Sequence, residues 1–174
     1  MSVHAILNNK AYKAKEKTQH LSDGLLGNTL HLSDFIAEIQ LVKDPAKATC
    51  IEALAHVAEK NPQLITEEAL VLLIDCLLSK AARVKWESAR AIGYTISSYP
   101  NQVDYALQQL IANINDEGTV VRWSIAFALG EILKMNTPST ISLVSLFQRQ
   151  IEREEKKSIQ KIYQQALKQV ESSF

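Results

Sequence analysis

The sequence has few of the residues that build turns and disulfides. Of its 174 residues, 5 are glycine and 4 are proline. Because a β-sandwich needs many turn residues, this scarcity favours an all-α fold. Two cysteines, Cys50 and Cys76, are too few for a disulfide framework. Both stand among apolar residues at helical positions, so we expect small core hydrophobes and not a redox pair or metal ligands.

The chain also lacks net charge and long apolar runs. Lys and Arg total 19, as do Asp and Glu, so the formal net charge is zero. This balance argues against a general binder of nucleic acid or acidic membranes. The longest apolar run, 69–78, is interrupted by Asp75 and is too short to cross a bilayer. Residues 1–10 show no signal peptide, so we expect a cytoplasmic protein with no membrane partner.

Motifs that carry catalysis are missing as well. The sequence has no phosphate-binding loop, dinucleotide fingerprint or nucleophile elbow. His4, His20, His31 and His56 have no metal-ligand spacing with Cys, Asp or Glu. Glu52 and His56 are four residues apart on one helical face, which is typical of a surface pair. We expect no enzyme activity, no cofactor and no metal.

An internal repeat of about 37 residues is the strongest signal in the sequence. The segment 119–134 has one apolar helical face, formed by Val121, Ile125, Ala128, Leu129 and Ile132, with Thr119 expected as N-cap. Five of its positions recur 37 residues earlier. Val84 matches Val121, Lys85 matches Arg122, Trp86 matches Trp123, Ala91 matches Ala128 and Gly93 matches Gly130. A repeat of this period predicts a helical solenoid.

The apolar periodicity and the Pro and Asn residues divide the chain into helix pairs. We expect one α-solenoid domain over 1–174, with an N-terminal cap helix at 2–28 and pairs at 33–61, 66–98, 102–135 and 138–171. The charged run 152–157 is expected to be a solvated turn that starts the last helix. Short connections make paired helices antiparallel. Because no helix buries its apolar stripe alone, the pairs must stack.

The turn and second helix of the segment 115–133 resemble a HEAT repeat. Asp116 stands at the family's turn Asp, Val121 and Arg122 at its Val-Arg pair, and 128–130 at its Ala-Leu-Gly end. The resemblance covers about 33–171 and implies an α-α superhelix of about four HEAT-like helix pairs with an N-terminal cap helix. It also implies that the Asp and Arg bond along the stack, and that the second helices line the concave surface.

The earlier units keep less of this pattern. The unit before has Ser79 and Lys80 where the Asp would be, and the earliest keeps only Lys47 and the small-apolar segment 53–55. The ladder of Asp and Arg residues is therefore expected to be incomplete.

A partner-binding groove is the first interpretation of the conspicuous residues on the second helices. On a helical wheel, Trp123 and Phe127 fall opposite the apolar face, and Trp86 and Arg90 take the same places one unit earlier. Large aromatics with Arg on a concave face are typical of binding sites. The candidate partner-binding residues are Trp86, Arg90, Tyr94, Trp123, Phe127, Lys85 and Arg122. Lys85 and Arg122 would help to orient an acidic partner.

Two other interpretations stay open. The two tryptophans could pack against each other and close the seam between units, and a catalytic role is the third alternative. Some DNA glycosylases that remove alkylated bases are built of HEAT-like repeats with tryptophans, basic residues and an essential carboxylate. Here no Asp follows either Trp by one turn, and the chain has no net positive charge.

The sequence thus favours a non-enzymatic scaffold or adaptor that binds a protein or peptide in a concave groove. A nucleic-acid-binding relative of the glycosylases is the alternative, and homo-oligomerisation is left open.

Overall fold

The computed structural model describes residues 1–172 and is helical throughout, with no strand in that range. The expectation of an all-α helical-repeat fold is confirmed. The helices are α1 Val3–Asn8, α2 Ala14–Leu26, α3 Leu32–Leu41, α4 Ala46–Lys60, α5 Glu67–Asp75, α6 Ala82–Thr95, α7 Val103–Ala112, α8 Thr119–Lys134, α9 Ile141–Arg153 and α10 Lys157–Glu171. Short 3₁₀ turns occupy Pro62–Leu64, Cys76–Leu78, Ile96–Ser98, Pro100–Gln102 and Pro138–Thr140.

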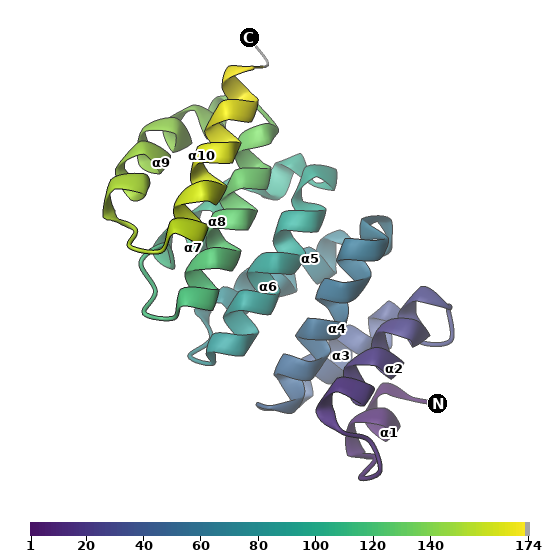
Figure 1. Ribbon diagram of the computed structural model, residues 1–174. Coiled ribbons are helices and arrows are strands. Elements are labelled where there is room, and N and C mark those ends of the chain that lie inside the picture. Colours follow the sequence, from purple (N-terminus) through teal and green to yellow (C-terminus); the bar gives the residue numbers. More distant parts are fainter. Residues whose placement is uncertain (173–174) are drawn as a thin grey trace.

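The helices form two layers (Figure 1). The even-numbered helices, α2 to α10, pack side by side in chain order, and the odd-numbered helices lie behind them. Neighbouring odd-numbered helices contact one another more sparsely. Because the even-numbered helices pack more closely with one another, we call them the inner layer.

Four helix pairs lie where the periodicity places them, and the front of the chain differs. Segment 2–28 forms two helices, α1 and α2, instead of one cap helix. The break is local: the Asn9 side chain accepts a hydrogen bond from the Ala11 N–H at 2.9 Å. Glu16 then accepts one from the Lys13 N–H at 2.7 Å, which fixes the start of α2.

The core runs as one cluster along the whole array. The predicted apolar face of α8, formed by Val121, Ile125, Ala128, Leu129 and Ile132, is fully buried. Thr119 was expected to be the N-cap, but it is the first helical residue. The N-cap is Gly118. Asp116 accepts the Gly118 N–H at 2.8 Å and thereby organises the turn before α8.

Both cysteines are free and buried, as expected for small core side chains. None of the helices in residues 1–172 has the length and apolar character that crossing a bilayer requires.

Candidate functional site: the inner surface of α6 and α8

One side of α8 presents an apolar stripe to solvent. Val120, Trp123 and Phe127 are spaced three and four residues apart, so they lie on one helical face. Val120 is 51% exposed and Trp123 is 41% exposed, whereas Phe127 is half-buried. The indole of Trp123 stacks on the Phe127 ring, with centroids 6.2 Å apart and planes at 18°. We call these three residues the α8 stripe.

The stripe continues onto α6 through an aromatic contact. The rings of Tyr94 and Phe127 lie 5.1 Å apart at 58°. The Tyr94 hydroxyl donates a hydrogen bond to Glu59 of α4 at 3.1 Å. Burial, and then the Glu59 carboxylate, raise the pKa of Tyr94, so its hydroxyl stays protonated and remains a donor. Three inner helices therefore meet at this place.

Phe127 owes its position to a glycine on the neighbouring helix. A Cβ atom at Gly93 would lie 2.5 Å from Cε1 of Phe127, so the ring rests directly on the backbone of α6. Phe127 is thus partly a seam residue between units, and Trp123 stacks on it. Among the described residues, the ring contacts join Trp123 to Phe127 and not to Trp86.

Trp86 and Arg90 lie on α6 within a network of carboxylates. The Trp86 indole N–H donates to Glu87 Oε1 at 3.0 Å. Arg90 pairs with Glu87 at 2.9 Å and with Glu59 at 3.8 Å. Trp86 is half-buried and packs against the core. This part of the surface is therefore polar and its charges are paired within the chain, but Glu87 Oε2 and the Nε and Nη2 atoms of Arg90 are buried without a hydrogen-bond partner.

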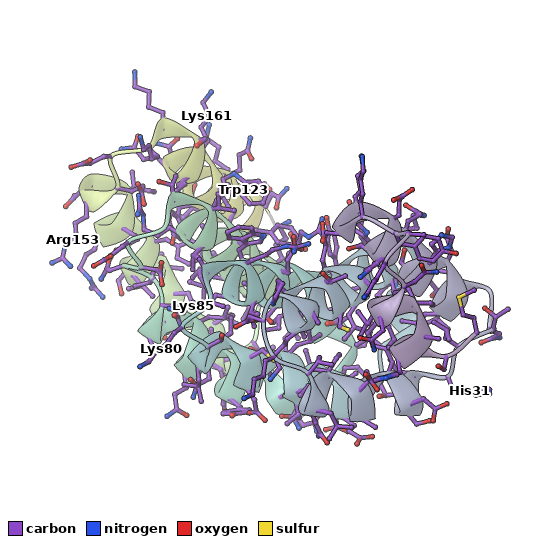
Figure 2. All side chains as sticks on the ribbon, turned by 90° about the horizontal axis from the view of Figure 1, so that it is seen from below. His31, Lys80, Lys85, Trp123, Arg153 and Lys161 are labelled. Carbon is purple, nitrogen blue, oxygen red and sulfur yellow. The ribbon has the colours of Figure 1, made fainter. Side chains whose placement is uncertain are left out.

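Lys85 and Arg122 hold neighbouring units together. Lys85 Nζ pairs with Asp116 Oδ2 at 2.7 Å. Arg122 makes two hydrogen bonds to Glu154, of 2.9 and 3.2 Å, and a third to the Asp116 carbonyl at 2.9 Å. Neither cation therefore adds an unpaired positive charge to the inner surface. In Figure 2 Lys85 lies at a different place on the surface from Trp123.

The ion pairs lower the pKa values of their carboxylates, Asp116 and Glu154. Desolvation raises the pKa of Asp116, but hydrogen bonds from Lys85 and the Gly118 N–H outweigh it, and the net pKa is lowered. Glu154 behaves likewise: desolvation opposes, and the Arg122 hydrogen bond is the main cause of its lowered pKa. In turn the Glu154 hydrogen bond raises the pKa of Arg122.

The expectation that 152–157 is simply solvated is wrong at Glu154, which is buried. The burial of Glu154 could not be recognised within the charged run, because its partner Arg122 lies 32 residues away. Sequence reasoning also missed Val120. Its signal was its position three residues before Trp123 on the same face.

Comparisons with known proteins bear on the fold alone. No protein-family model matches this chain, and no curated protein matches it. The crystal structure of an engineered protein is similar, with a TM-score of 0.72 and 18% sequence identity, over 98% of this chain and 80% of that chain. At this identity the likeness supports a helical-repeat architecture and carries no function.

Proposed function

We propose that this protein is a non-enzymatic scaffold that binds a protein or peptide partner on its inner layer, with the α8 stripe as the centre of contact. The observation that carries the proposal is the exposure of Val120 and Trp123 beside an aromatic cluster. Trp and Tyr are the residues whose truncation most often weakens protein interfaces. An exposed aromatic stripe on a rigid helix loses little conformational entropy when a partner covers it.

The surroundings of the stripe support a protein partner. Interfaces typically combine an apolar centre with a polar rim. Here Arg90 with its two carboxylates lies to one side, and the Lys134–Glu131 ion pair, of 2.5 Å, lies further along α8. The rim is therefore charged but internally paired.

The charge distribution revises the expected chemistry of the partner. Lys85 and Arg122 are neutralised by Asp116 and Glu154, so they do not select an acidic partner. Near the stripe, Glu59 and Glu87 outnumber Arg90. We propose an apolar segment with neutral or basic flanks. The same pairing disfavours a nucleic acid, which needs several unpaired cations to contact phosphates.

Capture from a cell lysate with a matched set of variants tests the proposal. Trp123→Ala and Val120→Ser remove the exposed stripe, whereas Ile141→Ser removes an isoleucine of α9 that is 72% exposed. We expect a nuclease-resistant protein partner that the Ile141→Ser variant retains and both stripe variants lose. Equal capture by all four proteins would contradict the proposal, as would a bound species that nuclease removes.

A further inference from the structure

Two of the ion pairs between successive units share one arrangement at an edge of the array. In each, the cation lies in the first turn of an inner helix, and the acid lies 31 or 32 residues later, at the turn before the next inner helix. Lys85 of α6 pairs in this way with Asp116, and Arg122 of α8 with Glu154. We call each such pair a rung.

The rung of the preceding unit lacks its acid. Lys47 lies in the first turn of α4, in the place of Lys85 and Arg122. Leu78 and Ser79 stand 31 and 32 residues after it, so no carboxylate occupies the position of Asp116 or Glu154. Lys47 makes no ion pair and no side-chain hydrogen bond with any residue in 1–172. The ammonium group of this half-buried lysine is therefore unpaired.

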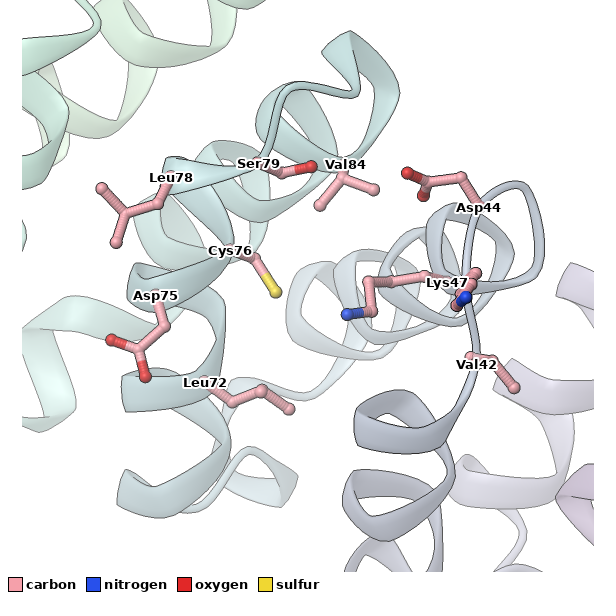
Figure 3. A pocket seen from close by; sticks show the side chains of 10 residues that line it. Val42, Asp44, Lys47, Leu72, Asp75, Cys76, Leu78, Ser79 and Val84 are labelled. Atoms are coloured by element: carbon pink, nitrogen blue, oxygen red, sulfur yellow. The ribbon is translucent and has the colours of Figure 1, made fainter.

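A cavity of about 670 Å³ lies at this place, with Lys47 and Ser79 both in its lining. Lys47 extends into it from α4, and Ser79 and Val84 lie across from the turn at Asp44 (Figure 3). Beside the complete rung of Arg122 and Glu154 the corresponding cavity is only about 260 Å³.

Part of the lining around Lys47 is apolar. Leu72 extends toward the opening, Val42 lies on the opposite side of it, and Leu78 is 69% exposed at its edge. An apolar side chain next to an acidic one would find contact here.

We propose that this cavity binds one carboxylate of an acidic side chain, Asp or Glu, presented by a protein partner with an apolar neighbour. The partner's carboxylate pairs with Lys47 as Asp116 pairs with Lys85 and as Glu154 pairs with Arg122. The site is separate from the α8 stripe and does not depend on the function proposed for it.

The other charges of the lining favour a single carboxylate over a phosphate group. Asp44 and Asp75 also line the cavity and balance Lys43 and Lys47. Asp75 already accepts a hydrogen bond from the Tyr105 hydroxyl. Both carboxylates repel any anion in the cavity, and they repel a dianion about twice as strongly as a monoanion, so a single carboxylate beside Lys47 is the better fit.

Heteronuclear NMR titration of the full chain tests the site directly. The probe is a short peptide with Leu-Glu-Leu at its centre, acetylated and amidated at its ends, and the control peptide carries Gln for Glu. We expect amide shifts confined to 42–47 and 72–84, with the Gln peptide about fivefold weaker or more. Lys47→Gln should remove the preference for Glu, whereas Lys80→Gln, at an exposed lysine outside the lining, should keep it.

A second pair of variants tests whether an acid at position 79 restores the rung within the chain. Ser79→Glu should pair with Lys47, raise the melting temperature and abolish binding of the Glu peptide. Ser79→Gln, of the same size but neutral, should leave the melting temperature lower than Ser79→Glu does. If Ser79→Glu and Ser79→Gln have equal melting temperatures, the interpretation of Lys47 as a rung without an acid is wrong.

Other outcomes would overturn the proposal. Equal binding of the Glu and Gln peptides, or no shifts at millimolar peptide, would contradict a carboxylate site. Inorganic phosphate that competes as well as the Glu peptide would show a general anion site. Free glutarate that binds as tightly as the peptide would show that the apolar walls contribute nothing and that no protein partner is required.

Discussion

The phenyl ring of Phe127 lies directly on the backbone of Gly93. A Cβ atom at position 93 would be 2.5 Å from Cε1 and 2.8 Å from Cδ1 of the ring. The same ring contacts both Tyr94 and Trp123. A residue without a side chain on α6 therefore makes room for the aromatic cluster on which the exposed stripe rests.

This contact predicts opposite effects at two glycines that occupy equivalent places in the repeat. Gly93→Ala should destabilise the protein by up to about 2 kcal/mol, because overpacking costs roughly 1–3 kcal/mol and outweighs a helix-propensity gain of about 1 kcal/mol. Gly130→Ala should be neutral or stabilise by up to about 1 kcal/mol, since its Cβ would meet Ala166 at an ordinary 3.5 Å. Urea denaturation checks both.

A control tests whether the Phe127 ring causes the destabilisation by Gly93→Ala. In a Phe127→Ala background the Gly93→Ala change should lose its cost and become neutral or stabilising. A cost that persists without the ring would assign the strain to another neighbour.

The two aromatic residues of the α8 stripe should differ in their effect on stability. Phe127→Ala removes a half-buried ring from the seam and should cost roughly 2–3 kcal/mol, somewhat less than a fully buried phenylalanine. Trp123→Ala removes an exposed ring and should cost under about 1 kcal/mol. Free energies of unfolding for the two variants measure this directly. If Trp123→Ala is the more costly, Trp123 is a seam residue and the stripe loses its centre.

The rung between Arg122 and Glu154 should make stability depend on acid pH. The pKa of Glu154 is lowered from its ordinary value of 4.5, and the pKa of Asp116 is lowered from 3.8. Both carboxylates therefore contribute stability that is fully present above about pH 4.5 and is lost as pH falls through the lowered values. Glu154→Gln should cost roughly 2–4 kcal/mol at pH 7, because it leaves Arg122 without its carboxylate.

The Glu154→Gln variant and the wild type should draw closer as pH falls from 4.5, and should converge below the lowered pKa of folded Glu154, where the residue is protonated in both folded and unfolded wild-type chains. Thermal melts between pH 3 and pH 7 measure the difference. A gap between the two proteins that stays constant over this range would show that the loss in the variant comes from packing and not from charge.

The cysteine thiols should be unreactive in the folded protein. Burial, and then the charge of Glu38, raise the pKa of Cys50 to about 12. Burial also raises the pKa of Cys76. Because the thiolate is the reactive form, iodoacetamide at pH 8 should modify both cysteines slowly in the native protein and quickly in urea. Rapid native labelling would indicate local opening of α4 or of the turn after α5.

The sequence predicts the scaffold well because the scaffold depends on local periodicity. The apolar face of α8 and the interruption of the ladder at Ser79 both follow from the repeat. The split of 2–28 into two helices depends on how Asn9 ends α1 and Glu16 fixes the start of α2, which the lysine-rich composition conceals.

The site was predicted less completely because its contacts span units. Lys85 and Arg122 resemble free groove cations until their acids, 31 and 32 residues away, are placed beside them. The helical wheel put Phe127 opposite the core, but the packing of that ring on Gly93 required the relative position of α6 and α8. Periodicity along one helix carries no information on how far a neighbouring helix is shifted along its axis.

Photocrosslinking from position 123 is the most direct test of the proposed binding surface. A photoreactive phenylalanine replaces Trp123 in one protein and the exposed Ile141 in another, and both are irradiated in cells and in nuclease-treated lysate. The scaffold proposal predicts a discrete crosslinked protein from position 123 that is absent from position 141. The same bands from both positions, or no crosslink from position 123 in either setting, would contradict it.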